Sequence, residues 1–447
     1  MTVAAAPAAA ARASSHGWRN AGAYLRDPLG FMTSLRRSHG TVVDVPFPGD
    51  HDFLFLSEPD LIRRVLVEER AAFVKGRALQ AARRLLGDGL LTSEGADHRR
   101  RRRLIQPVFH SALIERYGTA MVDAAERSSD RLQAGAVVDA NAEMTRLALE
   151  IVGRTIFDAD VEADAPEIGR VLQAGMRVFH RFLLPGGELM WRLPLPATRR
   201  FNAARAAFDD AVFDLIRERR EPRLEPDLID HLLALTTEDG RRALSDAEIR
   251  DEAVTLLLAG HETTAQALTW TWYLLARNAA ASERLAEELQ RVVGDRRLEV
   301  SDVPNLPYTT AVFRESLRVY PPVWALARIA TRPVELDGLT VQEGRPVVMS
   351  QWVVHRDPAC FERPQAFIPE RWLGGFQPAP GTYFPFGAGS RICIGERFAM
   401  LEGTLVLATL ARRWRLVPHA PAPRIDPRFT LRPHGGMPAT VRPAPAG

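Results

Sequence analysis

The stretch 246–278 limits the possible folds of this chain more than any other part of the sequence. Ser245 and Asp246 form a capping pair at its start, and the residues that follow predict one helix of about thirty residues, roughly 45 Å long. Its middle, from Ala253 to Leu275, is apolar on most faces. A helix of this kind is buried through the centre of a large domain when it does not lie in a membrane. No run of about eighteen apolar residues occurs in the chain, so we expect no membrane anchor.

The rest of the pattern predicts a mainly α protein, a single large helical domain with small peripheral β-sheets. We expect a short helix from Asp27, strands at 41–45 and 53–56, and further short strands within 332–349 and 428–441. Helical periodicity predicts the longer elements, which are 59–68, 98–116, 118–133, 140–157, 164–184, 198–220, 226–236, 246–278, 281–293 and 307–319.

Composition supports one domain and excludes some classes of partner. No Ser/Gly linker divides the 447 residues, so we expect a domain over 21–447 after a disordered, alanine-rich tail at 1–20. That tail lacks the basic head and apolar core of a secretory signal, and we expect a soluble, cytoplasmic protein. The net charge of +3 is too small to indicate a nucleic-acid partner. Lys75 is the only lysine, which we interpret as coding bias.

Polar residues interrupt the apolar middle of the long helix. They form a group from Gly260 to Thr264, with His261, Glu262 and Thr263 between the two. Buried polar groups cost free energy unless they are satisfied, so this group suggests a function. A hydroxyl that bonds its own helix and an acid in a structural pair are the alternative interpretation.

The ten residues Phe386–Gly395 place Cys393 in a glycine-rich loop, behind an aromatic ring and beside Arg391. Such a loop is typical of a thiolate bound to heme iron, where glycines allow tight turns close to the porphyrin. The alternative is an ordinary buried cysteine. Cys360 is the one other cysteine, and two cysteines cannot build a zinc or iron–sulfur shell; we interpret Cys360 as packing.

This loop resembles the cysteine loop of the cytochrome P450 family, Phe-x-x-Gly-x-Arg-x-Cys-x-Gly, at every fixed position. The segment Ala259–Thr264 is similar to the central-helix pattern of the same family. The resemblance extends from about Asp27 to Pro443 and implies a heme-thiolate monooxygenase that carries heme b, with Cys393 as the axial ligand. A thiolate ligand favours cleavage of the O–O bond, the difficult part of inserting oxygen into a C–H bond.

The resemblance also implies roles for individual residues. Thr263 would hydrogen-bond the oxygen bound at the iron, and Glu262 would relay protons to it from solvent. The remaining cofactor-binding residues implied by the resemblance are His98, Arg102, Arg328, Arg391, Phe386, Gly387, Ala259 and Gly395. Ala259 and Gly260 would leave room for the heme face, and His261 would be solvent-facing or structural.

Two further groups are interpreted through the same resemblance. Glu315, Arg318 and Arg371 would form a structural Glu–Arg–Arg network. Within the run of five arginines at 99–103, Arg99 and Arg100 would help to dock an acidic redox partner.

The expected substrate is a hydrophobic small molecule. A terpenoid is the leading prediction, a fatty acid or a steroid is the alternative within the family, and a heme-based sensor is the alternative that is not an enzyme. Besides O₂, the partners would be a separate ferredoxin and its NAD(P)H-dependent reductase, and we expect a monomer. The residues expected to line the pocket are 73–91, 176–184, 256–263, 323–326, 430–431 and Met437, with Arg77, Arg177 and Arg181 able to reach a carboxylate.

Overall fold

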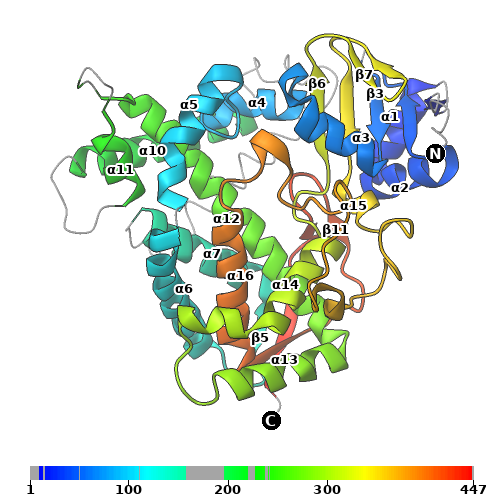
Figure 1. The fold of residues 1–447 in the computed structure, drawn as a ribbon. Coiled ribbons are helices and arrows are strands. Elements are labelled where there is room, and N and C mark those ends of the chain that lie inside the picture. Colours follow the sequence, from blue (N-terminus) through cyan, green and yellow to red (C-terminus); the bar gives the residue numbers. More distant parts are fainter. Residues whose placement is uncertain are drawn as a thin grey trace. The chain divides into compact units, whose positions relative to one another are not determined.

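The computed structural model describes residues 10–13, 16–49, 51–109, 111–157, 196–219, 227–236, 240 and 242–444 (Figure 1). These residues form two compact units, and each unit combines segments that are far apart in the sequence. The sheet unit takes its residues from 1–80, 317–366 and 376–393, and the helical unit from 81–316, 367–375 and 394–447. The predicted helix at 164–184 lies outside the described residues.

The sheet unit is built on a mixed, six-stranded sheet with the strand order β1-β2-β3-β9-β6-β4. Its strands are β1 (Ala11–Arg12), β2 (Val42–Val45), β3 (Phe53–Leu56), β4 (Phe73–Lys75), β6 (Leu326–Ala330) and β9 (Pro346–Met349). β3 and β9 are parallel, whereas β6 is antiparallel to both β9 and β4. Leu56, Phe73 and Val347 are fully buried in its core.

Short helices and one hairpin complete the sheet unit. They are α1 (Gly17–Arg26), α2 (Pro28–His39), α3 (Pro59–Arg63), the π-helix η1 (Arg64–Glu68), η2 (Arg70–Ala72), α15 (Gln351–Val354) and η6 (Gly389–Arg391), with the hairpin β7 (Val334–Leu336) and β8 (Leu339–Val341). In the segment 1–20, β1 pairs with β2 and α1 begins at Gly17, while residues 1–9 and 14–15 lie outside the described residues. The described strands and helices therefore begin ahead of residue 21.

The helical unit contains most of the long helices. These are α5 (Gly95–Ile105), α6 (Ser111–Arg131), α7 (Ala140–Ile156), α10 (Pro196–Glu218), α11 (Leu228–Ala234), α12 (Asp246–Ala276), α13 (Ala279–Val292) and α16 (Glu396–Ala411), with the 3₁₀ turns η3 (Gln106–Phe109), η4 (Val300–Asn305) and η5 (Pro369–Trp372). The boundary between the units falls inside α4 (Arg77–Leu86) and inside α14 (Pro307–Val319). Two small sheets belong to this unit, one of β10 (Trp414–Pro418), β13 (Pro438–Pro443) and β5 (Val137–Asp139), the other of β11 (Ile425–Asp426) and β12 (Arg432–Pro433).

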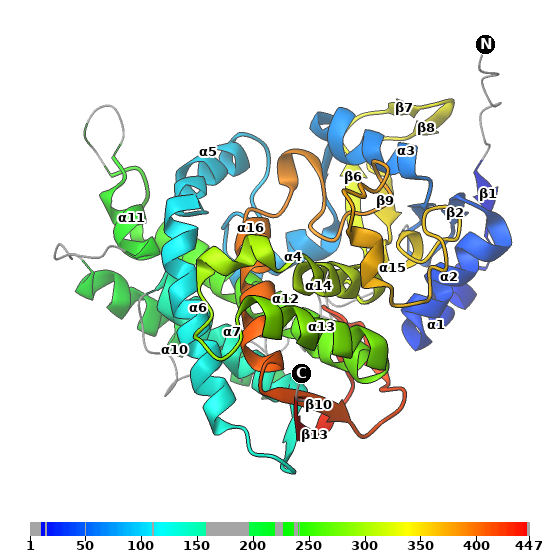
Figure 2. The same cartoon turned by 60° about the horizontal axis from the view of Figure 1, so that its bottom comes forward.

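The helix α12 forms the centre of the helical unit, as its apolar sequence predicts. It packs against α7, α10 and α16, and Figures 1 and 2 both show α12 and α16 side by side. Its first turn is closed by a capping box in which Ser245 and Glu248 exchange hydrogen bonds. Trp270 in its second half is fully buried and donates its indole N–H to the Leu431 carbonyl at 2.8 Å. The mainly α fold class with small sheets is therefore confirmed.

Several element boundaries differ from the predictions. The predicted helix 98–116 is three elements, α5, η3 and α6, since Pro107 interrupts the helical hydrogen bonding. The predicted helix 59–68 changes from α to π at Arg64. The helices α1, α4 and α16 were not predicted. In the described part of the chain, no helix is long and apolar enough to cross a membrane.

Candidate functional site

The cysteine loop is closed by its own backbone. The Cys393 N–H donates to the Phe386 carbonyl at 2.9 Å, and the Ile392 N–H donates to the Gly389 carbonyl at 3.1 Å. Cys393 is an exposed cysteine, so it is accessible to a ligand. Cys360 instead packs against the core of the sheet unit, and burial raises the pKa of its thiol to about 11. The structure therefore distinguishes the two thiols as the sequence predicts.

Two glycines of the loop have conformations that other residues rarely adopt. Gly387 and Gly389 have φ of 74° and 70°. A Cβ on Gly389 would also lie 2.1 Å from the Leu66 carbonyl oxygen of η1. Gly395 differs from the expectation, because its φ of −89° is open to any residue; it is the N-cap of α16, and its carbonyl accepts from Ala399 N–H.

Arg391 fixes the loop to the edge of the sheet. Its guanidinium donates to the carbonyls of Arg70 at 3.1 Å and Phe73 at 2.8 Å. These contacts hold the loop against η2 and β4. The contact between Arg391 and a heme carboxylate, which the sequence predicts, would be additional.

Arg328 has a second cation beside it that the sequence analysis did not assign to the site. Arg328 is buried in β6 and pairs in register with Lys75 of β4, which is also buried. Residues directly opposite each other in an antiparallel pair project from the same face of the sheet. Two buried cations on one face suit an anionic ligand. The sequence signal that could have identified Lys75 is that it is the single lysine in an arginine-rich chain.

The buried middle of α12 has one partly exposed patch, which is called its open face below. From Glu252 to Leu275 every residue is buried except Ala259, Gly260 and Thr263. The spacing i, i+1 and i+4 puts these three on one face. They are small, and the sequence predicts a role for each of the three. A Cβ on Gly260 would meet Val152 at 3.0 Å, so this glycine also allows α7 to pack closely.

Glu262 is held by the C-terminal hairpin of the helical unit. Its Oε1 accepts from the Thr430 hydroxyl at 2.7 Å, from the Arg432 guanidinium at 2.6 Å and from Gln266 at 3.5 Å. All three contacts use Oε1. Arg432 is a partner that the sequence analysis did not identify, since 170 residues separate it from Glu262.

The neighbours of Glu262 differ in their surroundings. Thr263 is half-buried and donates to the Ala259 carbonyl at 2.8 Å, which is the helix-bonding contact of the alternative interpretation. His261 is buried and its Nδ1 lies 2.7 Å from the Leu257 carbonyl oxygen. Burial lowers the pKa of His261, and the neighbouring Glu262 opposes this. His261 is structural, and the solvent-facing alternative is wrong.

The arginine run on α5 divides into buried and exposed members. His98 and Arg101 are buried, Arg102 is half-buried, and Arg99 and Arg103 are exposed. Arg100 pairs at the surface with Asp97 and Glu248. Arg101 pairs with Asp97, Glu248 and the fully buried Glu252, contacts that were not predicted.

The predicted structural network is confirmed for its acid and one arginine. Glu315 is fully buried and accepts from Arg371 Nε at 3.0 Å, from Ile368 N–H at 3.0 Å and from Trp372 Nε1 at 2.8 Å. Arg318, on the same helix, donates to carbonyls in the sheet unit, those of His355, Pro364 and Ala366. The predicted pocket residues 176–184, including Arg177 and Arg181, lie outside the described residues.

Residues of the sheet unit suit an iron porphyrin with carboxylate groups. An accessible cysteine on a glycine-built loop suits an axial thiolate, and buried cations at 75 and 328 suit carboxylates. In the helical unit, Ala259, Gly260 and Thr263 form a small, partly exposed face of α12. The donor set therefore agrees with the cofactor that the sequence implies.

The chain is similar to known proteins over almost its whole length. The family model "Cytochrome P450" matches residues 21–438. Cyclooctatin synthase of Streptomyces melanosporofaciens is 40% identical over 408 residues, 90% of this chain and 88% of that protein. Cyclooctat-9-en-7-ol 5-monooxygenase of the same organism is 36% identical, covering 88% of this chain and 86% of that protein. Pentalenene oxygenase of Streptomyces avermitilis is 36% identical, covering 94% of this chain and 91% of that protein.

The family match includes both the cysteine loop and the open face of α12. Cyclooctatin synthase and pentalenene oxygenase each match 90% or more of this chain. The chain therefore belongs to the cytochrome P450 family of monooxygenases, which hold heme b through an axial cysteine thiolate.

Proposed function

We propose that this monooxygenase hydroxylates a cyclic terpenoid. The observation that carries the proposal is the similarity to three Streptomyces enzymes named for cyclooctatin, cyclooctat-9-en-7-ol and pentalenene, which are terpenoid compounds. The described residues expected near the substrate support it: Leu256, Leu257 and Leu258 precede the open face of α12, and Leu431 and Met437 are buried. Apolar walls of this kind bind a compact hydrocarbon by excluding water.

Within this proposal, Cys393 would hold the heme iron through its thiolate, and Arg102, His98, Arg328 and Arg391 would hold the heme carboxylates. Lys75 joins them through its position opposite Arg328. Phe386 shields the sulfur, Gly387 shapes the loop, and Ala259 and Gly395 allow close approach. The bound heme supplies the activation of O₂ for insertion of one oxygen atom into a C–H bond.

Glu262 and Thr263 move protons in the proposed reaction. Glu262 relays a proton from solvent while its Oε1 stays with Thr430 and Arg432. The Thr263 hydroxyl leaves the Ala259 carbonyl and passes the proton on, which requires only rotation about its χ1.

Two electrons come from a separate ferredoxin with its NAD(P)H-dependent reductase, and the protein acts as a monomer. Arg99 and Arg103 are the exposed cations of α5 that can meet an acidic partner, whereas Arg100 is already paired with acids of its own chain. The cytoplasmic location stays a prediction from the sequence.

Binding and turnover with defined compounds test this function. Pentalenene, dodecanoic acid and progesterone are added separately to the ferric protein, and the Soret shift is measured. Each is then incubated with ferredoxin, reductase and NADPH for product analysis. We expect a high-spin shift and an oxygenated product with pentalenene. Product from the fatty acid or the steroid alone would favour the alternative within the family, and heme binding without any product would favour a sensor.

A further inference from the structure

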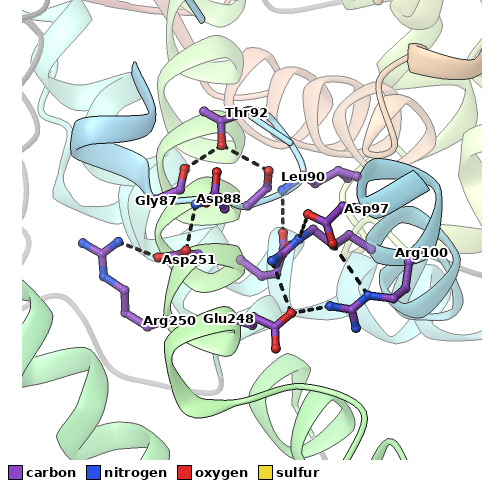
Figure 3. Close-up of polar contacts among 12 residues, drawn as sticks. Gly87, Asp88, Leu90, Thr92, Asp97, Arg100, Glu248, Arg250 and Asp251 are labelled. Carbon is purple, nitrogen blue, oxygen red and sulfur yellow. Dashed lines mark hydrogen bonds and ion pairs between the residues drawn. The ribbon is translucent and has the colours of Figure 1, made fainter. Parts of the chain in front are cut away.

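The loop 87–94, which connects α4 to α5, lies directly on α12 in the helical unit. The Asp88 N–H donates to Asp251 Oδ2 at 2.7 Å, and the Leu90 N–H donates to Glu252 Oε2 at 2.8 Å (Figure 3). The Thr92 hydroxyl closes the loop on itself by donating to the Gly87 carbonyl at 2.6 Å. Consecutive carboxylates of α12 thus hold the backbone of this loop.

Two glycines make this close approach possible. A Cβ on Gly87, whose φ is 72°, would lie 2.0 Å from Asp251 Oδ1. A Cβ on Gly89 would lie 2.3 Å from the Thr255 hydroxyl and 2.6 Å from the Asp251 carbonyl oxygen. The loop cannot carry side chains at these positions without moving away from α12.

Glu252 joins the loop to the helix α5 that follows it. Its side chain is fully buried, and its Oε1 accepts from Arg101 at 2.9 Å. Arg101 is itself 5% exposed and also reaches Asp97 at 2.8 Å. Burial raises the pKa of Glu252, while the Leu90 N–H and Arg101 oppose the shift. We name Leu90, Arg101 and Glu252 the α12 clamp.

The clamp lies within one turn of the proposed heme-binding residues on α5 and about two turns from Ala259 on α12. On α5, Arg101 shares the buried face with His98 and precedes Arg102. On α12, Glu252 lies seven residues before Ala259, about 10 Å along the helix. A buried ion pair is a weak device for stability, because the desolvation of both charges offsets their attraction. The contacts of Glu252 with Leu90 and Arg101 instead hold α5 at one position along α12.

We propose that Glu252 and Arg101 are positioning residues for the cofactor. By holding α5 and the loop 87–94 on α12, they set where His98 and Arg102 meet the heme carboxylates. This inference rests on the heme-binding roles proposed above for those two residues. It assigns a role to the one member of the arginine run whose charge is buried.

The test uses the holoenzyme with three sets of substitutions. Glu252→Gln keeps an acceptor for Leu90 but removes the charge that pairs with Arg101. Arg101→Met with Glu252→Met removes both charges and fills the space with apolar side chains, which can restore stability. Arg100→Gln is the matched control, because it is the neighbouring arginine and its acid partners lie at the surface. The rate of heme transfer to excess apomyoglobin and the melting temperature are measured for each.

We expect heme to leave Glu252→Gln about tenfold faster than the wild type, as for residues that orient the groups around a metal. The double variant should melt near the wild-type temperature and still lose heme faster, and Arg100→Gln should match the wild type. An unchanged rate in Glu252→Gln would overturn the proposal. So would a double variant that regains both the melting temperature and the wild-type rate, because the pair would then be structural only. The role of the clamp is judged from the rate of heme loss of each variant relative to that of the wild type. The absorption spectrum of the wild type tests the proposed function separately.

Discussion

At the scale of single residues, the cysteine loop depends on Gly389 for two separate reasons. Its φ is positive, and a Cβ would collide with the Leu66 carbonyl oxygen, which is backbone and cannot move aside easily. Gly387 has the same kind of φ, but its Cβ would meet atoms no closer than 3.9 Å. We expect Gly389→Ala to lower the fraction of heme-loaded protein strongly and Gly387→Ala to lower it less.

Comparing the two variants separates the effect of the positive φ, which both glycines have, from the effect of the collision, which only Gly389 has. Heme content per protein and melting temperature are measured for both alanine variants after identical purification. Equal losses in the two would mean that the close approach of Gly389 to η1 is unimportant for the loop.

Glu402 on α16 gives a prediction about pH. The side chain is fully buried, and burial raises its pKa well above 4.5, with Thr264 acting in the opposite direction. A carboxyl whose pKa is raised on folding contributes stability that is complete below its unfolded pKa and is lost as pH rises through its folded pKa. We therefore expect the wild type to lose melting temperature with rising pH relative to Glu402→Gln, which keeps the size but has no proton to release.

Melting temperatures of both proteins from about pH 5 to about pH 9 check this. If the two curves of melting temperature against pH run parallel over that range, folding does not change the pKa of Glu402.

At the scale of elements, α12 contains threonines that make the same local bond in different surroundings. Thr263 and Thr271 each donate to the carbonyl four residues earlier, at 2.8 Å and 2.7 Å, but Thr271 is fully buried and Thr263 is on the open face. We expect Thr263→Ala to uncouple NADPH consumption from product, with hydrogen peroxide released, and to slow product formation by about a hundredfold.

Thr271→Ala is the control for the helix itself, and Thr263→Ser should recover most of the coupling because it keeps the hydroxyl. Product, peroxide and NADPH are measured in one reaction. If Thr263→Ala remains coupled, the hydroxyl serves only to bond its own helix.

The elements that sequence reasoning predicted are those with visible periodicity or caps. The strands β2 and β3 and the helices α7, α12 and α14 lie within a few residues of their predicted bounds. The helix α16 was not predicted, because Leu405 to Leu410 are buried on all sides and leave no polar stripe to mark a helical period. The helix α4 follows β4 after one residue, which leaves little signal for its start.

At the scale of the whole molecule, each unit is assembled from distant segments, and this limits what the sequence predicts about the site. The cysteine loop and the open face of α12 are local motifs, and both were predicted from their residues. The partners of these motifs are not local: Glu262 contacts Arg432 170 residues away, and Glu252 contacts Leu90 162 residues away. Lys75 comes beside Arg328 only through the pairing of β4 with β6. No local pattern encodes these contacts.

Ligation of heme iron by the Cys393 thiolate is tested by the absorption spectrum of the reduced, carbon monoxide-bound protein. The spectrum is recorded for the wild type, for Cys393→Ser and for Cys360→Ser as the control. Thiolate ligation by Cys393 predicts a strongly red-shifted Soret band in the wild type and in Cys360→Ser, and loss of this band in Cys393→Ser. A band at the position typical of histidine ligation in the wild type, or a red-shifted band that persists without Cys393, would contradict it.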